Sequence, residues 1–471
     1  MLGIPEIDAR IVSAVYVALA AGVTMHVLLH KRDIGASIGW IGLAWLSPIL
    51  GSVLYVIFGV NRVKRRAIRL YDAQRATEAA KTPPASATRD DHLAPLEHAG
   101  CRITERPVEG GNAITLLSNG DAAYPKMLAV IDAAHASVAL SSYIFRADTA
   151  GMRFIEALIR AHQRGVAVRI IIDGIGGGYF LSRTYRRLRR AGVPVARFLH
   201  SPLPWRMPVL NLRSHKKLLV VDGRIAFTGG LNIAGENVLG DRPRHPVQDL
   251  HFSFEGPVVA QLSETFAADW LFVADEELSG NTWFPRLDAR GDGAARAIVS
   301  GPDQDLEKIE FMILEAIACA RQSIKIMTPY FLPDDRLVTA LALTAMRGVA
   351  VDIIAPERGD HRILEWAMRA HIAPLIDAGC RLWSNPPPFN HAKIMTIDGS
   401  WCLIGSANWD TRSFRLNFEL NMEVYHSDLV AQVDALMAAK QSRLITAADL
   451  DRRSLPIRLR DNAARLMLPY L

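Results

Sequence analysis

The chain opens with two long apolar runs separated by a short polar turn. Residues 11–29 and 38–60 contain no Asp, Glu, Lys or Arg, and residues 30–37 lie between them. About 20 consecutive apolar residues are enough for a helix to cross the roughly 30 Å hydrocarbon core of a bilayer. Residues 1–66 are therefore predicted to contain a transmembrane helical hairpin with a basic flank, whose second span is kinked at Pro48.

Two other interpretations of this segment stay open: a cleaved signal peptide, and a pair of buried helices in a soluble protein. A signal peptide fits poorly, because Glu6 and Asp8 stand where such a leader carries basic residues, and a second apolar run follows at once. The buried pair is less favoured, because both runs have the length that a bilayer requires.

Basic side chains gather directly after the second apolar run. Between residues 62 and 75, six basic residues stand against one acidic residue, Asp72, so this stretch carries +5 of the formal net charge of +6. By the positive-inside rule, the cluster predicts that both ends of the hairpin and the rest of the chain face the cytoplasm. An enzyme that binds nucleic acid would spread basic charge over its catalytic body, whereas this body is nearly neutral.

The remaining chain contains a linker followed by a sequence that repeats. Residues 67–110 are predicted to be the linker, because they include a run of Pro, Ala, Ser and Thr that is typical of tethers. Beyond them, Arg164–Val168 recurs as Arg347–Val351, and each copy leads into an apolar strand. Both copies alternate helices with strands. The predicted fold class is therefore α/β, with two homologous halves at 111–285 and 286–471 related by a pseudo-twofold axis.

Each half carries the same polar motif. It reads H-x-K-x4-D and is followed by G-x-x-N in both copies. Two copies of so specific a spacing, at equivalent points of a repeat, are not a chance match. The residues predicted to be catalytic are His215, Lys217, Asp222, His391, Lys393 and Asp398.

The spacing of the motif indicates where its side chains point. Alternate residues of a strand share a face, so each histidine points the same way as the lysine two residues further on. The Asp-Gly pairs at 222–223 and 398–399 predict two-residue hairpin turns. Such turns would place His391 opposite Ser406, and the first histidine opposite Gly230. The aspartates then sit at the turns with the opposite parity, where a structural or salt-bridging role is expected.

These residue types suit the chemistry of a phosphodiester. A lysine neutralises phosphate oxygens, while one histidine attacks phosphorus and the other protonates the leaving alcohol. Asp249 and Glu419 follow the two motifs at matching points and are predicted to orient the histidine rings. No clustered acidic ligand set is visible in the sequence, so neither a metal nor a cofactor is expected. The residues predicted to bind phosphate are Asn232, Ser406 and Asn408.

The paired motifs resemble the signature of the phospholipase D superfamily. The resemblance implies a multi-pass protein of the bacterial inner membrane that converts two phosphatidylglycerols into cardiolipin and glycerol through a phosphatidyl-histidine. It favours His215 as the nucleophile, and it implies phosphatidylglycerol and the membrane, not nucleic acid, as partners. The resemblance covers nearly the whole chain, and the further runs that are similar to bacterial cardiolipin synthases are 31–59, 143–145, 173–176, 228–232 and 416–419.

Two positions depart from the family pattern. Gly230 stands where the second half has Ser406, so the first half lacks a hydroxyl donor. Asp249 lies further behind its motif than Glu419 does.

Two alternative functions stay open: one uses the motif residues for hydrolysis, and the other uses only the predicted membrane hairpin. A phospholipase D-type hydrolase would act on phospholipid or, with less support, on nucleic acid, and the near-neutral body weighs against the latter. A non-enzymatic membrane scaffold is the third alternative, and the intact second copy of the motif weighs against it. The sequence makes no prediction of the oligomeric state or of the preferred acceptor alcohol.

Overall fold

The computed structural model describes residues 9–30, 34–59, 91–200, 212–302 and 305–466. They form two compact units. The first unit holds the N-terminal helices, and the second holds the described residues from Asp91 onward. Each unit has its own hydrophobic core.

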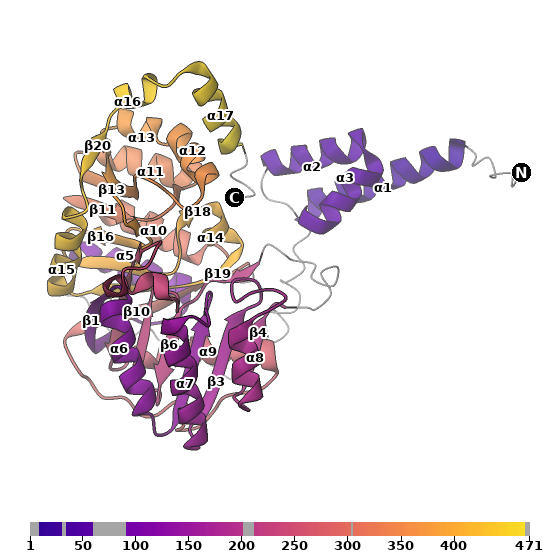
Figure 1. The fold of residues 1–471 in the computed structure, drawn as a ribbon. Helices are drawn as coiled ribbons and strands as arrows, with labels where there is room; N and C mark the ends of the chain where they lie inside the picture. The colour runs from indigo at the N-terminus through magenta and orange to yellow at the C-terminus, as the bar shows by residue number, and fades with distance from the viewer. Residues whose placement is uncertain (1–8, 31–33, 60–90, 201–211, 303–304, 467–471) are drawn as a thin grey trace, which may run out of the picture. The chain divides into compact units, whose positions relative to one another are not determined.

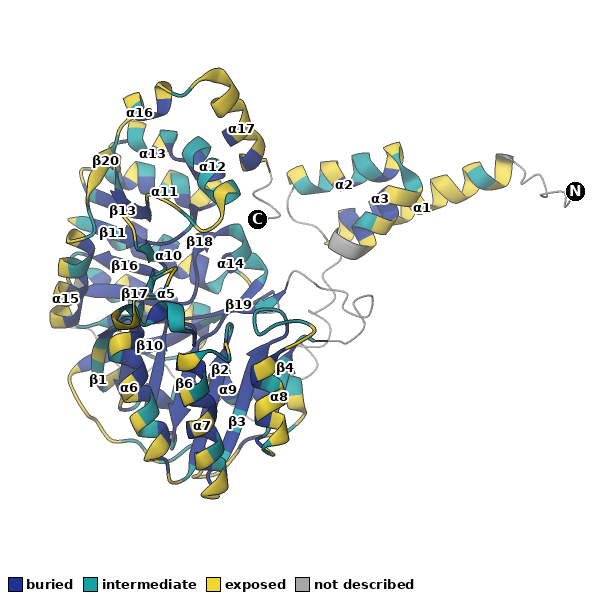
Figure 2. Cartoon of the chain, viewed as in Figure 1, coloured by how far each residue is buried: buried dark blue, intermediate teal, exposed yellow. Residues whose placement is uncertain are grey.

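The described residues of the N-terminal unit are helical apart from Ser47. It consists of α1 (Ala9–His30), α2 (Ile34–Leu46), α3 (Pro48–Leu54) and the π-helical turn η1 (Tyr55–Gly59). Residues 10–30 of α1 are long and apolar enough to cross a membrane, by length and composition. Figure 2 shows that α1 exposes most of its surface.

The second predicted span, residues 38–60, is interrupted at Ser47, next to the kink expected at Pro48, and its described residues belong to α2, α3 and η1. The helix ends before Ser47, whose φ of −144° and ψ of 79° are not helical, because the residue before a proline is driven out of the helical region. α3 then returns close to α2, and a Cβ on Gly51 would lie 2.5 Å from the carbonyl oxygen of Leu43. With 13 residues, α2 rises only about 20 Å, which is too short to cross a bilayer alone.

A mixed sheet of 16 strands runs through the second unit (Figure 1). The strands of the first half are β1 (Glu109–Ser118), β2 (Ser137–Ser142), β3 (Ala167–Asp173), β4 (Val195–Phe198), β5 (Arg213–Ser214), β6 (Leu218–Val221), β7 (Ile225–Gly229), β8 (Val247–Gln248) and β9 (Leu250–Glu255). Those of the second half are β10 (Gly293–Ser300), β11 (Ser323–Met327), β12 (Phe331–Leu332), β13 (Ala350–Pro356), β14 (Arg381–Asn385), β15 (Phe389–Asn390), β16 (Ile394–Ile397), β17 (Trp401–Gly405), β18 (Trp409–Asp410), β19 (Asn417–Tyr425) and β20 (Arg443–Ile445).

The strand order shows the internal repeat. It is β1-β9-β7-β6-β2-β3-β4 in the first half and β10-β19-β17-β16-β11-β13-β14 in the second, so the two orders correspond strand for strand. β1 and β10 pair antiparallel where the halves meet. The predicted α/β fold with two homologous halves is confirmed.

Helices cover both faces of the sheet (Figure 1). In each half the chain alternates helix and strand before it reaches the motif, as the sequence predicted. The helices are α5 (Ala94–Thr104), α6 (Asn119–Asp132), α7 (Thr149–Gln163), α8 (Arg183–Arg190), α9 (Val259–Ala274), α10 (Lys308–Cys319), α11 (Asp335–Met346), α12 (Arg362–His371), α13 (Ala373–Asp377), α14 (Thr411–Arg415), α15 (Ser427–Ala438), α16 (Ala447–Asp451) and α17 (Leu455–Arg465).

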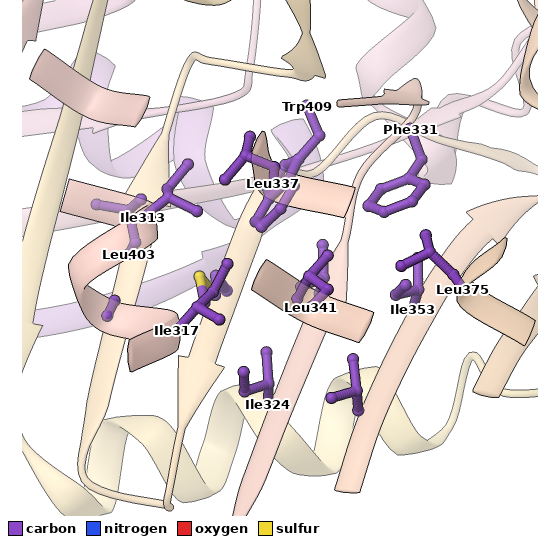
Figure 3. Packing of buried hydrophobic residues seen from close by; sticks show 14 of the residues in the cluster. Ile313, Ile317, Ile324, Phe331, Leu337, Leu341, Ile353, Leu375, Leu403 and Trp409 are labelled. Atoms are coloured by element: carbon purple, nitrogen blue, oxygen red, sulfur yellow. The ribbon is translucent and has the colours of Figure 1, made fainter. Parts of the chain in front are cut away.

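The core of the second half shows that the predicted linker is too long. Figure 3 shows side chains of α10 and α11 packed over the strands, with Ile313 and Leu341 among them. Leu96 of α5 is fully buried in the same cluster. Part of the predicted linker, residues 67–110, is therefore a helix of the second half's core, and residues 67–90 lie outside the described residues.

The hairpins β6–β7 and β16–β17 turn at the predicted Asp-Gly pairs, but their strands do not pair in the predicted register. Asp222 and Gly223 have φ values of 53° and 61°, and the N–H of Arg224 donates to the carbonyl of Val221 at 3.0 Å. The ladder nevertheless pairs Val221 with Ile225, so one extra residue follows the turn. The second hairpin pairs its strands with the same shift, and the predicted opposition of His391 with Ser406 is wrong.

Candidate active site

Each motif histidine lies on an extended segment that is bonded to the other half of the chain. β5 pairs in parallel with β19, and the N–H of His215 donates to the carbonyl of Phe418 at 2.9 Å. β15 pairs in parallel with β8, and the N–H of His391 donates to Gln248 at 2.7 Å. Both motifs therefore cross the junction between the halves.

The predicted ring-orienting carboxylates serve the opposite half. His215 Nδ1 lies 3.0 Å from Glu419 Oε2, and His391 Nδ1 lies 2.8 Å from Asp249 Oδ2. The ring centroids of the two histidines are 6.5 Å apart. The crossed carboxylates thus hold both imidazoles at one site, with Nδ1 engaged in each ring.

The two lysines of the motif are buried beside the histidines. Lys217 Nζ donates to the carbonyl of His215 at 2.6 Å, and Lys393 Nζ lies 2.7 Å from His391 Nδ1. Both side chains are at most 3% exposed. An anion that enters the site would therefore find two ammonium groups in a region of low dielectric constant, where their attraction is strong.

Burial and neighbouring charges shift the pKa values of these groups. Burial and the charge of Lys393 lower the pKa of Lys217 to about 7, and burial lowers that of Lys393 to about 8. Burial lowers the pKa of His215 to about 4, although Glu419 acts against it. Burial opposes ionisation of Glu419, but His215 and Lys217 lower its pKa to about 2. The arrangement favours a neutral imidazole held by an ionised carboxylate.

Of the residues predicted to bind phosphate, Ser406 contacts this cluster directly. Ser406 Oγ donates to Glu419 Oε2 at 2.5 Å, so its hydroxyl supports the carboxylate. Asn232 accepts a bond from the N–H of Ile144 at 3.3 Å. Asn408 is 7% exposed, and its Oδ1 has no partner among the described residues.

The glycine that departs from the family pattern has a steric reason. A Cβ on Gly230 would lie 2.1 Å from Asp249 Oδ1. Asp249 therefore occupies the space in the first half that a serine side chain would need. The longer Glu419 leaves room for Ser406 at the equivalent point of the second half, so the two halves are not chemically identical.

The motif aspartates lie apart from the histidines, as their parity indicated, and do not belong to the catalytic cluster. Asp222 accepts hydrogen bonds from the backbone N–H groups of residues 135–137, at 2.7–3.2 Å. Asp398 accepts from those of residues 321–323, at 2.8–2.9 Å. In each half the four residues of a strand, about 13 Å of chain, separate the aspartate from the motif lysine. Each carboxylate joins its hairpin to the loop before β2 or β11.

Tyr143 is a site residue that the sequence analysis did not assign. Its ring meets that of His215 edge to face, with centroids 4.9 Å apart. Lys217 Nζ lies 5.3 Å from the centre of the same ring. The sequence signal for Tyr143 was its position directly after β2, which pairs in parallel with β3, because ligands bind at the carboxyl ends of parallel strands.

Each of the two histidines is held by a carboxylate of the other half and flanked by a buried lysine. This arrangement is typical of the two-motif, phosphodiester-processing enzymes of the phospholipase D class. A family model described as "Cardiolipin synthase, PLD-like domain" matches residues 127–270 and 313–440. The chain belongs to this cardiolipin synthase family.

Relatives of similar length are named cardiolipin synthases. The cardiolipin synthase of Geobacillus sp. (strain WCH70) is 33% identical over 459 residues, which cover 94% of this chain and 90% of the relative. That of Oceanobacillus iheyensis is 30% identical over 487 residues, covering both chains fully. The crystal structure of a phosphatidylserine synthase from Haemophilus influenzae Rd KW20 is similar in fold, with a TM-score of 0.61 and 16% identity over 80% of this chain and all of that one.

Asp222→Asn should reduce stability more than turnover. The substitution replaces an ionised acceptor of backbone N–H groups with an amide, which costs about 1–3 kcal/mol, and it touches neither histidine. The thermal melting midpoint should fall while cardiolipin formation persists below it. Asp132→Asn, at an exposed pair with Arg160, is the matched control and should leave the midpoint nearly unchanged. Wild-type melting with lost turnover would contradict this assignment.

Proposed function

We propose that this enzyme joins two phosphatidylglycerol molecules into cardiolipin and glycerol by two successive displacements at phosphorus. The observation that carries the proposal is the crossed pair of histidine–carboxylate contacts, which brings His215 and His391 to 6.5 Å between ring centroids. A single phosphodiester between the rings would have a nucleophile on one side and an acid on the other. Membership of the cardiolipin synthase family supports this choice of substrate and product.

In the first displacement, His215 attacks the phosphorus of one lipid. Its Nδ1 is engaged by Glu419, so the attacking atom is Nε2. The new N–P bond forms as the bond from phosphorus to the glycerol oxygen breaks, and that oxygen takes a proton from His391. Burial lowers the pKa of His391, and the negative charge of the bound phosphodiester acts in the opposite direction, favouring the protonated ring.

In the second displacement, the neutral His391 takes the proton from the headgroup hydroxyl of the acceptor lipid. The acceptor oxygen bonds to phosphorus as the N–P bond to His215 breaks, which regenerates both histidines. Lys217 and Lys393 neutralise the non-bridging oxygens throughout, and an anionic substrate favours their charged forms. Water in place of the acceptor would give phosphatidic acid, so the site must favour the lipid alcohol over water.

We also propose that the N-terminal unit anchors the enzyme in the bacterial inner membrane, with the catalytic unit in the cytoplasm. α1 has the length and apolar composition of a membrane span. The six basic residues between positions 62 and 75 support the cytoplasmic side, because basic flanks are retained there. The same charges would attract anionic lipids such as phosphatidylglycerol.

Purified full-length enzyme in phosphatidylglycerol vesicles with EDTA should form cardiolipin and glycerol in equal amounts. Lipid mass spectrometry and a glycerol assay on the same sample measure the two products. The double variant His215→Ala, His391→Ala is the control and should form neither. Phosphatidic acid as the main lipid product would instead establish a hydrolase.

The phosphatidyl group should be trapped on His215 and not on His391. His391→Ala lacks the acid, but a donor lipid with an activated leaving group does not need one. This variant should therefore accumulate an acid-labile phosphohistidine at position 215, detectable by mass spectrometry of peptides. His215→Ala should accumulate none, and an adduct at His391 in that variant would reverse the assignment.

The cytoplasmic orientation is open to a protease test. Protease added to sealed, right-side-out cells should leave the catalytic unit intact, because the membrane shields it. Permeabilised cells serve as the control and should show digestion. Cleavage of the catalytic unit in sealed cells would show the opposite orientation.

A further inference from the structure

The surroundings of the two histidines differ at equivalent points of the repeat. β5 and β15 occupy the same place in the two halves, because each pairs in parallel with the segment that carries the other half's carboxylate. Arg213 stands two residues before His215, and Phe389 stands two residues before His391. The segment before His215 therefore carries a cationic residue in addition to the nearby ring of Tyr143, whereas the segment before His391 carries a second aromatic residue.

The aromatic side leads from His391 to an acidic group. The ring of Phe389 lies 6.1 Å from that of His391 and 6.4 Å from that of Tyr330, between centroids. The hydroxyl of Tyr330 donates to Asp360 Oδ1 at 2.5 Å. Tyr330 follows β11 and Asp360 follows β13, so both lie at the carboxyl ends of central parallel strands, where ligands bind.

Asp360 is the accessible carboxylate among those that act on the ammonium group of Lys393. The acidic groups that attract this ammonium are Asp249, Glu419, Asp360 and Asp410. Asp249 and Glu419 are buried and hold the histidine rings. Asp410 is 6% exposed and accepts from the N–H of Ser413 at 2.6 Å. The side chain of Asp360, in contrast, is 46% exposed.

Position and charge together indicate what Asp360 would bind. A carboxylate repels a phosphate, so it does not belong to the phosphate subsite formed by the lysines. It accepts hydrogen bonds from hydroxyl groups, and the group released and accepted beside His391 is the polyol glycerol. In the first half the carboxylate at the end of β3, Asp173, is 2% exposed, and its oxygens accept from the N–H groups of residues 175, 176 and 214, so they are engaged by the backbone.

We propose that Asp360 and Tyr330 form the headgroup subsite that recognises the glycerol moiety of phosphatidylglycerol beside His391. The proposal rests on the proposed function and assigns the specificity of its leaving and accepting group. Asp360 accepts hydrogen bonds from the glycerol hydroxyl groups that do not react. Tyr330 holds the carboxylate in place through its hydroxyl, which burial and Asp360 keep protonated by raising its pKa. A site that pairs with a substrate hydroxyl rejects an alcohol that lacks it.

The test compares alcohols as acceptors of the phosphatidyl group. Full-length enzyme in phosphatidylglycerol vesicles receives labelled glycerol and 1-propanol in competition, and the ratio of labelled phosphatidylglycerol to phosphatidylpropanol is measured. The wild type should prefer glycerol. Asp360→Ala and Tyr330→Phe should lower the ratio, the former about tenfold or more, because a charged acceptor of hydroxyl bonds is lost. Asp335→Asn, another carboxylate outside the site on α11, is the matched control and should keep the wild-type ratio.

The outcomes separate this subsite from other roles. A loss of rate with an unchanged ratio would show that Asp360 acts only on the charge of Lys393 or on folding, and would overturn the proposal. A wild-type ratio and rate in both variants would overturn it as well. Ethanolamine is added as a third acceptor, and a loss of preference confined to it would show an ammonium site instead. If the wild-type enzyme transfers the phosphatidyl group neither to an added alcohol nor to a second phosphatidylglycerol, the proposed function itself fails.

Discussion

Each histidine of the active site is held by a carboxylate that belongs to the other half of the chain. Glu419 contacts His215 and Asp249 contacts His391, so neither half contains a complete catalytic unit. The backbone repeats this exchange, because β5 pairs with β19 and β15 pairs with β8. The antiparallel pairing of β1 with β10 continues one sheet through both halves. The arrangement of both histidines thereby depends on the integrity of the junction.

Burial of two lysines beside the histidines and carboxylates of this junction changes their pKa values. Burial in a region of low dielectric constant lowers the pKa of both lysines, and the charge of Lys393 lowers that of Lys217 further. An anionic phosphodiester acts in the opposite direction and favours the charged forms of both lysines.

The pseudo-twofold axis is broken where the reaction needs two different partners. Gly230 and Asp249 in the first half are equivalent to Ser406 and Glu419 in the second. Asp249 occupies the space that a serine side chain at position 230 would need, whereas Ser406 donates to Glu419. The surroundings diverge further at Arg213 and Phe389. A symmetric site would treat the attacking and leaving groups alike, whereas a displacement at phosphorus has a nucleophile on one side and an alcohol on the other.

Local patterns in the sequence were enough for much of this structure. The alternation of helix and strand, the repeat of the halves and the turns at the Asp-Gly pairs all follow from side-chain periodicity and backbone preference within a few residues. The same parity placed Asp222 and Asp398 away from the histidines. The register of the hairpins was one residue off, because an extra residue beyond the turn leaves no mark in the alternation.

The sequence by itself determined the fold class, the residue types of the site and the phosphodiester chemistry that they support. Only the tertiary structure decided which carboxylate serves which histidine, because these partners lie 204 and 142 residues apart and meet through sheet pairing that no local pattern encodes. It also decided that α5 joins the core of the second half. Packing between distant segments selects these arrangements, whereas short-range propensity allows several.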